Sequence, residues 1–465
     1  MMLFEQEKQQ PCFPDGQEQP DNKASEYQQP RALRDSQTRI PSGCSKLSRQ
    51  DIVDKVKGLI FGAVLGDCLG LATEGMTKDQ VKAVYGQGPI KFGLEDEDVT
   101  GVAGVPFFRD TYRAMFDDND FGDDTDQQLL LAQSLVWTGG MFNPKDFAKR
   151  LKHWSQHGLT PLNKPPVGLT HCTQSALSHP TFEQDPHHAA VDVWRSKHLL
   201  RAANGAITRA PLLGVVKFWD GTTVIENSAE CCKVTHPDPR SITASVIIST
   251  LVARVLRGQD MEYSSSEFPP SPTVQPTPTH HSMDRSPSNT PPLSGQDMEQ
   301  PPSQKYFMDT LPTDPSLLSL VDSAIEANKR CLTAPNTDPL FHSPETDHQL
   351  MQIYYQQLLE YCYPPVHLES LGLDHPDEYQ HVFKSLGAGI YGFTRQLPKG
   401  EQTSSFKRIL MDIVLQGGEA DTNASVAGAL LGLRIGYSHL PSEWVVGLKH
   451  WEWLEDCVEE FVGLL

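Results

Sequence analysis

The feature that most constrains this chain is a pair of acidic clusters, each directly in front of a strongly apolar segment. Residues 121–127 (FGDDTDQ) precede the apolar stretch 129–137, and residues 417–423 (GGEADTN) precede the stretch 424–432. The second stretch is small and apolar on every side, which is typical of a buried helix. Burying carboxylates at the start of such a helix costs free energy unless a cation or hydrogen bonds compensate.

Each cluster has two interpretations. An ordinary charged helix cap explains either one alone, because the helix dipole favours negative charge at the N-terminus. Two such clusters instead suggest that the helix ends meet around divalent cations. Clustered carboxylate and hydroxyl oxygens suit Mg²⁺ or Mn²⁺ better than Zn²⁺, and two cations bridged by carboxylates form a hydrolytic arrangement. Both interpretations stay open at the level of the sequence.

Five short blocks follow one another along the chain. They are 58–70 (GLIFGAVLGDCLG, with Glu74 after it), 122–125 (GDDT), 204–211 (NGAITRAP), 235–240 (THPDPR) and 417–423. Their order and content resemble the ADP-ribosylglycohydrolase family, which includes the glycohydrolase that reactivates dinitrogenase reductase. With the apolar stretch that follows the last block, the resemblance covers residues 58 to 432.

The resemblance implies a metal-dependent hydrolase that cleaves the glycosidic bond at C1″ of ADP-ribose, in ADP-ribosylated proteins or small ADP-ribose conjugates. It implies two Mg²⁺ ions, with Mn²⁺ as the alternative. The positions that match metal ligands are Asp123, Asp124, Glu419, Asp421 and Thr422. The matching catalytic residues are Glu74 and Asp124, and the matching substrate-binding residues are Asn204, Gly205 and His236.

Plainer interpretations exist for several of these residues. Glu74 is also explained as a solvated acid in a loop, and His236 as a structural histidine at a helix entrance. The Asn204-Gly205 pair is also explained as an ordinary junction between a loop and a helix. Four further histidines invite a zinc interpretation but share no ligand spacing, so we expect them on the surface: His171, His179, His187 and His188.

Three positions, in two of the blocks, depart from the pattern of the family. Gly122 stands where the family usually offers Thr or Ser, and Glu419-Ala420 stands where it usually has Asp-Thr. Glu extends the side chain by about 1.5 Å, one carbon–carbon bond. The alternative hypotheses are therefore a catalytically weak or inactive ADP-ribose-binding protein, or a structural protein that keeps the fold.

The apolar spacing predicts helices almost throughout. Strand-like alternation is scarce, so we expect an all-α chain. The resemblance implies a single compact orthogonal helical domain over residues 48–465. Ser48 and Asp51 form a predicted capping box, Asn143-Pro144 a predicted helix start, and residues 86–120 a long loop over the site.

Two segments have the composition of disordered chain. Residues 1–47 are rich in Gln, Glu, Pro, Asp and Ser, and the insert 259–310 includes ten prolines between positions 261 and 304. Neither segment offers the apolar residues that a core needs, which predicts disorder.

The charge limits the partners. With 59 acidic and 39 basic residues, the net charge is −20, which argues against binding nucleic acid or anionic membranes through general electrostatics. No membrane-spanning segment or signal peptide is expected. The nine cysteines include no Cys-x-x-Cys spacing, so a reducing compartment is the simplest interpretation. We expect a monomer in the cytoplasm, with the nucleus as the alternative.

Overall fold

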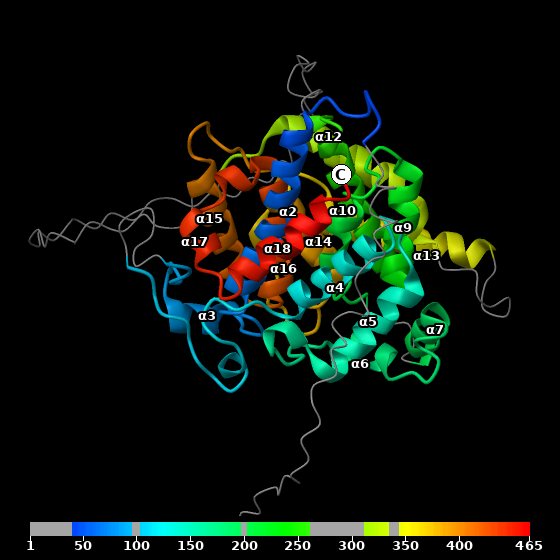
Figure 1. Cartoon of the computed structure of the whole chain (residues 1–465), viewed down its shortest axis with the longest axis horizontal. Helices are drawn as coiled ribbons and strands as arrows, with labels where there is room; N and C mark the ends of the chain where they lie inside the picture. Colours follow the sequence, from blue (N-terminus) through cyan, green and yellow to red (C-terminus); the bar gives the residue numbers. More distant parts are fainter. Residues whose placement is uncertain (1–39, 95–102, 197–201, 261–310, 334–343) are drawn as a thin grey trace, which may run out of the picture.

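The computed structural model describes residues 40–94, 103–196, 202–260, 311–333 and 344–465. Within these ranges the chain forms helices and no β-strand, only isolated bridges such as Ile90–Val105. The all-α prediction is therefore confirmed. The α-helices (Figure 1) are α2 (Arg49–Gly70), α3 (Lys78–Tyr85), α4 (Asp123–Trp137), α5 (Pro144–His157), α6 (His171–Leu177), α7 (Pro186–Ser196), α8 (Ala210–Leu213), α9 (Gly221–Lys233), α10 (Pro239–Leu256), α12 (Pro315–Asn328), α13 (Pro344–Cys362), α14 (Val382–Phe393), α15 (Gln402–Val414), α16 (Ala420–Ile435), α17 (Ser442–Val446) and α18 (Trp451–Val462).

The predicted helix starts are present. At the start of α2, the Ser48 hydroxyl accepts a hydrogen bond from Asp51 N at 3.1 Å, and the Asp51 carboxylate accepts one from Ser48 N at 3.2 Å. This is the predicted capping box. Helix α5 begins at Pro144 behind the Asn143 cap. Local side-chain chemistry therefore sets both boundaries.

Helices α2 and α16 pack backbone against backbone at the centre of the molecule (Figure 1). One face of α2 carries a glycine at every fourth position: Gly58, Gly62, Gly66 and Gly70. A Cβ atom at Gly66 would overlap the Ala424 carbonyl oxygen, and one at Gly70 would overlap the backbone of Asp421. Because only glycine permits this approach, the stripe fixes the start of α16 against the end of α2.

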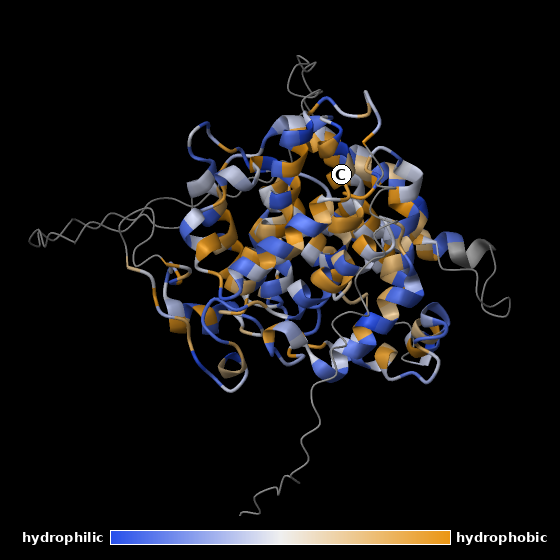
Figure 2. Ribbon diagram, in the orientation of Figure 1, coloured by the Kyte–Doolittle hydropathy of each residue, from blue (hydrophilic) through white to orange (hydrophobic). Residues whose placement is uncertain are grey.

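Other helices complete the core around this pair. Helix α16 also packs against α14 and α15, and α10 packs against α8, α9 and α12. Figure 2 shows apolar residues gathered on the inner helices and polar residues on the outer surfaces. Within the described ranges, α10 is the one helix that is long and apolar enough to span a membrane, but 89% of it is buried inside the protein. Core helices pass the same length and composition criteria, so α10 is weak evidence for a membrane span.

The two predictions of disorder, for residues 1–47 and 259–310, fall largely outside the described residues. The described edge of the first segment contacts the end of α10. The Ser45 hydroxyl donates to the Leu256 carbonyl at 2.6 Å, and Lys46 N donates to the Arg257 carbonyl at 3.1 Å. These bonds place residues 45 and 46 against the helical domain.

Candidate active site

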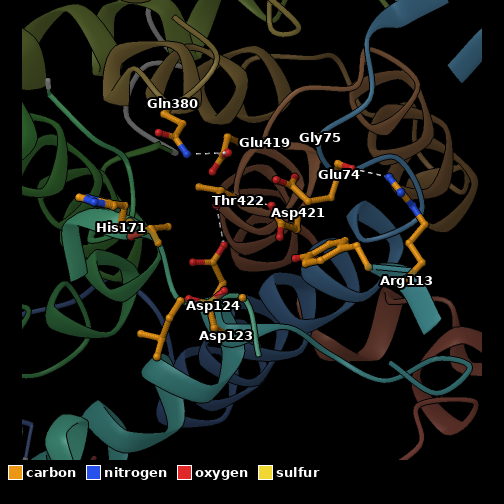
Figure 3. A pocket seen from close by; sticks show the side chains of 15 residues that line it. Glu74, Gly75, Arg113, Asp123, Asp124, His171, Gln380, Glu419, Asp421 and Thr422 are labelled. Carbon is orange, nitrogen blue, oxygen red and sulfur yellow. Dashed lines mark hydrogen bonds between the residues drawn. The ribbon is translucent and has the colours of Figure 1, made fainter. Parts of the chain in front are cut away.

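The N-termini of α4 and α16 meet at a cavity of about 620 Å³ (Figure 3). Most of the site residues predicted from the sequence line it, namely Glu74, Gly205, Asp123, Asp124, Glu419, Asp421 and Thr422. Lining residues that the sequence did not reveal are Gly75, Tyr112, Arg113, Gly168, Leu169, Thr170, His171 and Gln380. The predicted pair Asn204 and His236 is buried and does not line the cavity.

Direct hydrogen bonds hold the two acidic clusters together. The Thr422 hydroxyl donates to Asp124 Oδ2 at 2.7 Å, and the Thr208 hydroxyl donates to Asp124 Oδ1 at 2.8 Å. Before α16 the chain turns through Gly417 and Gly418, whose φ angles are +74° and +69°. Glycine adopts these angles readily, and the turn directs residues 419–422 into the cavity.

The helix-cap interpretation of the clusters does not match the hydrogen bonds. The N-cap residues, Gly122 for α4 and Glu419 for α16, make no side-chain cap hydrogen bond. The first N–H groups of α4 instead donate to Asp67, which comes from α2: Asp67 Oδ2 accepts from Gly122 N at 3.0 Å and from Thr125 N at 2.9 Å. Asp123, Asp124, Glu419 and Asp421 therefore face the cavity. Asp126, the remaining acid of the first cluster, instead accepts hydrogen bonds from Lys164 and Trp154.

Two groups of carboxylates have the spacing of metal ligands. The first is Asp67, Asp124 and Asp421, and the second is Glu74, Glu419 and Asp421. Within each group the oxygen atoms lie within 4.8 Å of one another. Asp421 belongs to both groups, and Figure 3 shows Glu74 and Asp124 on either side of it. This is the arrangement in which one carboxylate can bridge two cations.

Burial and mutual repulsion disfavour the ionised form of these carboxyl groups. Burial, and then the neighbouring Asp421, raises the pKa of Asp124 to about 7 and that of Glu419 to about 8. Burial also raises the pKa of Asp421 to about 6. The pKa of Glu74 lies well above its ordinary value for the same two reasons, burial first and Asp421 second. A divalent cation would remove the repulsion.

The donor set fits Mg²⁺ or Mn²⁺. All the candidate ligands are carboxylate or hydroxyl oxygens, which hard cations prefer. Two carboxylate oxygens, Asp67 Oδ1 and Glu74 Oε2, are buried and accept no hydrogen bond from an N–H or a hydroxyl group, and the Glu74 carboxyl instead lies against those of Asp421 and Glu419. Buried acceptors are normally satisfied, so a cation would supply the missing partner.

The remaining predicted ligands have protein partners. Asp123 Oδ2 accepts from the Gln127 side chain at 2.7 Å, and Asp123 belongs to neither ligand group. Glu419 Oε1 accepts from the Gln380 side chain at 3.3 Å (Figure 3). Gln380 lies far from every motif, so nothing in the sequence pointed to it.

One side of the cavity comes from the segment predicted as a loop over the site. Tyr112 and Arg113 lie in that segment and line the cavity. The Arg113 guanidinium donates to the backbone carbonyl of Glu74 and, at 2.9 Å, to that of Ala72. Arg113 therefore holds the backbone that carries the Glu74 carboxylate.

Of the three predicted substrate-binding residues, Gly205 forms part of the cavity wall, and Asn204 and His236 are buried. Gly205 lines the cavity, and a Cβ atom there would lie 3.3 Å from the His236 ring, so His236 lies behind it. Burial, and then Arg209, lowers the pKa of His236 to about 3, so the ring is neutral. The Asn204 side chain donates to the Ser385 hydroxyl at 3.0 Å. Asn204 and His236 therefore lie behind the cavity wall, and the Gly205 carbonyl accepts a hydrogen bond from the Arg209 guanidinium at 3.0 Å.

Of the four histidines considered for zinc, His171 is exposed at the cavity. His179 and His188 lie 3.8 Å and 3.2 Å from the Asp192 carboxylate. The ligand groups found among the described residues contain no histidine.

Comparison with known proteins identifies the family. A family model described as ADP-ribosylglycohydrolase matches residues 48–465. Proteins named ADP-ribosylarginine hydrolase Tri1 are similar over 232 residues: that of Pseudomonas putida is 23% identical (48% of this chain, 52% of the relative), and that of Serratia proteamaculans is 24% identical (50% and 54%). A protein of Archaeoglobus fulgidus is 25% identical over 204 residues, covering 43% of this chain and 55% of the relative. The chain spans about half the length of the curated relatives it matches.

A solved structure, titled ADP-ribosylglycohydrolase-related protein complex, superposes with a TM-score of 0.48 at 18% identity, covering 89% of this chain and 98% of the other. The family model spans the whole helical domain and every carboxylate of the cavity. The chain therefore belongs to the ADP-ribosylglycohydrolase family.

Proposed function

We propose that the protein hydrolyses the glycosidic bond at C1″ of ADP-ribose conjugates with the help of two divalent cations, Mg²⁺ or Mn²⁺. This proposal rests on one observation: Asp421, which lines the cavity, belongs to both groups of carboxylates. The volume of about 620 Å³ lies within the range of roughly 300–1,000 Å³ for small-molecule sites.

The chain offers carboxylate ligands for both cations. Asp124 and Asp421 would hold one cation, and Glu419 and Asp421 the other, with the Glu74 carboxylate beside the second. Asp123 and Thr422 lie beside them in the cavity wall. Bound cations would orient the ribose hydroxyls and acidify a water molecule. Helix dipoles at the starts of α4 and α16 would partly offset the negative charge.

Glu74 is the proposed general base. It takes a proton from the water whose oxygen attacks C1″, while the C1″–N or C1″–O bond breaks and its electron pair leaves with the departing group. A cation in the group of Glu74 would lower the raised pKa of this carboxyl, which a base requires. Gly205 presents backbone to the cavity and is proposed to contact the phosphates.

The first substrate to test is ADP-ribosyl-arginine, because two of the relatives are named for that activity. Purified full-length protein would be incubated with ADP-ribosyl-arginine, ADP-ribosyl-serine and O-acetyl-ADP-ribose, each with Mg²⁺, Mn²⁺ or a chelator. We expect free ADP-ribose with at least one substrate and only with metal. Absence of hydrolysis throughout, together with measurable ADP-ribose binding, would favour the binding-protein alternative.

We also propose a cytoplasmic location. The described cysteines are all free thiols, which suits a reducing compartment. Imaging the chain fused to a fluorescent protein would test this, and a signal confined to an oxidising organelle would contradict it.

A further inference from the structure

We propose that Asp67 of α2 is a metal ligand through Oδ1, and that the glycine at position 122 is what gives this oxygen access to the cation. The inference rests on the metal part of the proposed function. It adds a metal ligand from α2. In the sequence, the block 58–70 of this helix offered no candidate site residue, and Glu74 follows the block.

The two oxygens of Asp67 differ sharply in their surroundings. Oδ2 accepts three hydrogen bonds, from Gly122 N at 3.0 Å, from Thr125 N at 2.9 Å and from the Thr125 hydroxyl at 2.6 Å. Oδ1 accepts none, and the Asp67 side chain is 0% exposed. Capping α4 therefore uses one oxygen only, and the other is a fully buried acceptor that needs a partner.

The position of Asp67 indicates what that partner is. Its carboxylate belongs to the group with Asp124 and Asp421, whose oxygens lie within 4.8 Å of one another. Both oxygens of Asp124 already accept from hydroxyl groups, those of Thr208 and Thr422. Among the described residues that line the cavity, the Arg113 guanidinium faces the backbone of Glu74 and not this group. The buried cations Lys164 and Arg209 donate their hydrogen bonds elsewhere, Lys164 to Asp126 and Arg209 to Gly205 and Thr235. A divalent cation satisfies the geometry and the charge together.

Gly122 supplies the second, independent observation. Its φ and ψ of −90° and −167° are open to any residue, so backbone strain does not explain the glycine. A Cβ atom there would lie 2.7 Å from Asp67 Oδ1 and 3.5 Å from Leu71 Cδ2. A side chain at position 122 would thus displace the unpaired oxygen, and glycine leaves it in place.

The substitution Asp67→Asn separates the two roles of the residue. The three donors around Oδ2 require the amide oxygen to occupy that place. The amide nitrogen then takes the position of Oδ1, where it cannot bind a cation. The cap on α4 survives while the ligand is lost.

The measurement is Mn²⁺ binding to the full chain, by calorimetry and by electron paramagnetic resonance. We expect Asp67→Asn to lose one Mn²⁺ or to bind at least about tenfold more weakly, because even residues outside the ligand shell change metal affinity by about 10- to 100-fold. The matched control is Asp220→Asn, because Asp220 caps α9 and its carboxylate accepts hydrogen bonds from Thr222 N at 3.1 Å and from Thr223 N at 3.3 Å. Asp220 does not line the cavity, so Mn²⁺ affinity should be nearly unchanged.

Gly122→Ala provides a second route that keeps the charge of Asp67. Its methyl group should push Oδ1 aside and weaken Mn²⁺ binding, and this variant decides the question if Asp67→Asn does not fold. Wild-type affinity in both variants would overturn the assignment of Asp67 alone and indicate that Oδ1 shares a proton with a neighbouring carboxyl. Absence of Mn²⁺ binding by the wild-type chain would instead overturn the metal site itself, and with it the proposed catalytic role of metal.

Discussion

The hydroxyl of Thr422 and the carboxylate of Asp124 form a 2.7 Å hydrogen bond between residues that are 298 positions apart. The bond joins the first turn of α16 to the first turn of α4. Each acidic cluster therefore helps to position the other, which a helix cap within one cluster would not do. A substitution in either cluster should therefore change the position of side chains in both clusters.

Removing the charge of Asp124 or of Asp421 should abolish turnover. Asn keeps the size, and the hydroxyls of Thr208 and Thr422 can rotate to suit an amide, so the fold should survive. We expect Asp124→Asn and Asp421→Asn each to lower kcat by at least about 100-fold, and the double variant to be little worse, because the ligands act as a unit. Steady-state kinetics and thermal melts measure both effects.

The control for this pair is Asp220→Asn, since Asp220 caps α9 through Thr222 N and Thr223 N as an ordinary N-cap. It should leave kcat unchanged. Additive effects below tenfold for the two cavity residues would count against a shared metal site.

Chelation should destabilise the folded state. A ligand that binds only the native protein stabilises it by RT ln(1 + [L]/Kd), about 2.7 kcal/mol at a hundredfold excess over Kd. We expect a lower Tm after treatment with a chelator, and recovery with Mg²⁺ or Mn²⁺ but not with K⁺. Superimposable melting curves in all four conditions would show that the cavity binds no divalent cation.

The metal-free protein should lose stability as pH rises from about 6.5 to 8. The pKa values of Asp124 and Glu419 are raised to about 7 and about 8 in the folded state, from 3.8 and 4.5. The folded state therefore holds more protons than the unfolded state in this window, so the slope of unfolding free energy against pH is negative. Below about pH 6.5 two buried histidines have the opposite effect on stability. Burial lowers the pKa of His236 to about 3 and that of His381 to about 4, so the unfolded state binds more protons there and stability rises with pH.

Scanning calorimetry with chelator present should show a Tm that falls by about 2 °C or more across the window. Saturating Mg²⁺ should weaken or reverse this slope, because cation binding favours the deprotonated carboxylates. A metal-free Tm that rises steadily from pH 6.5 to 8 would be inconsistent with the raised pKa values.

Glu74→Gln should reduce kcat with little change in KM. A positioned general base contributes roughly 100- to 10,000-fold, whereas Gln keeps an oxygen that can face a cation. We expect kcat to fall by about 100-fold or more while Mn²⁺ affinity stays close to that of the wild type. The control is Glu369→Gln, an exposed carboxylate that pairs with Lys78. A parallel loss of metal binding would reassign Glu74 from base to essential ligand.

The insert should be dispensable. Residues 261–304 lie outside the described residues, and their composition offers almost nothing to a core. Replacing them with a short Gly/Ser linker should change Tm by no more than a few degrees, because a longer surface loop adds little closure entropy. Insoluble protein or a non-cooperative melt would show that the segment contributes to the fold.

Most of the fold followed from local signals in the sequence. The capping box at Ser48 and the Asn143 cap set helix boundaries through neighbouring residues, and such signals are legible without a partner. Asp123, Asp124, Asp421 and their neighbours were found because several oxygen donors stand together in the chain.

The parts of the site that were missed depend on contacts between distant segments. Asp67 is the one carboxylate in the apolar second part of α2, residues 58–70, and its partner Thr125 lies 58 positions away. The cost of burying a lone charge was a signal for it, but no spacing rule pointed to α4. Gln380 and Tyr112 reach the cavity from turns without any motif, so only the folded chain reveals them.

The glycine stripe on α2 predicts that substitutions outside the cavity lining would also abolish activity. Gly66 and Gly70 touch the backbone of α16 beside Ala424 and Asp421, and any side chain there must slide one helix along the other. Such a slide would carry Asp421 away from Asp67 and Asp124. In a survey of activity, Gly66 and Gly70 would therefore rank with the acidic residues as intolerant positions, although neither lines the cavity. Lost activity there would report the alignment of two helix axes rather than the loss of a reactive group.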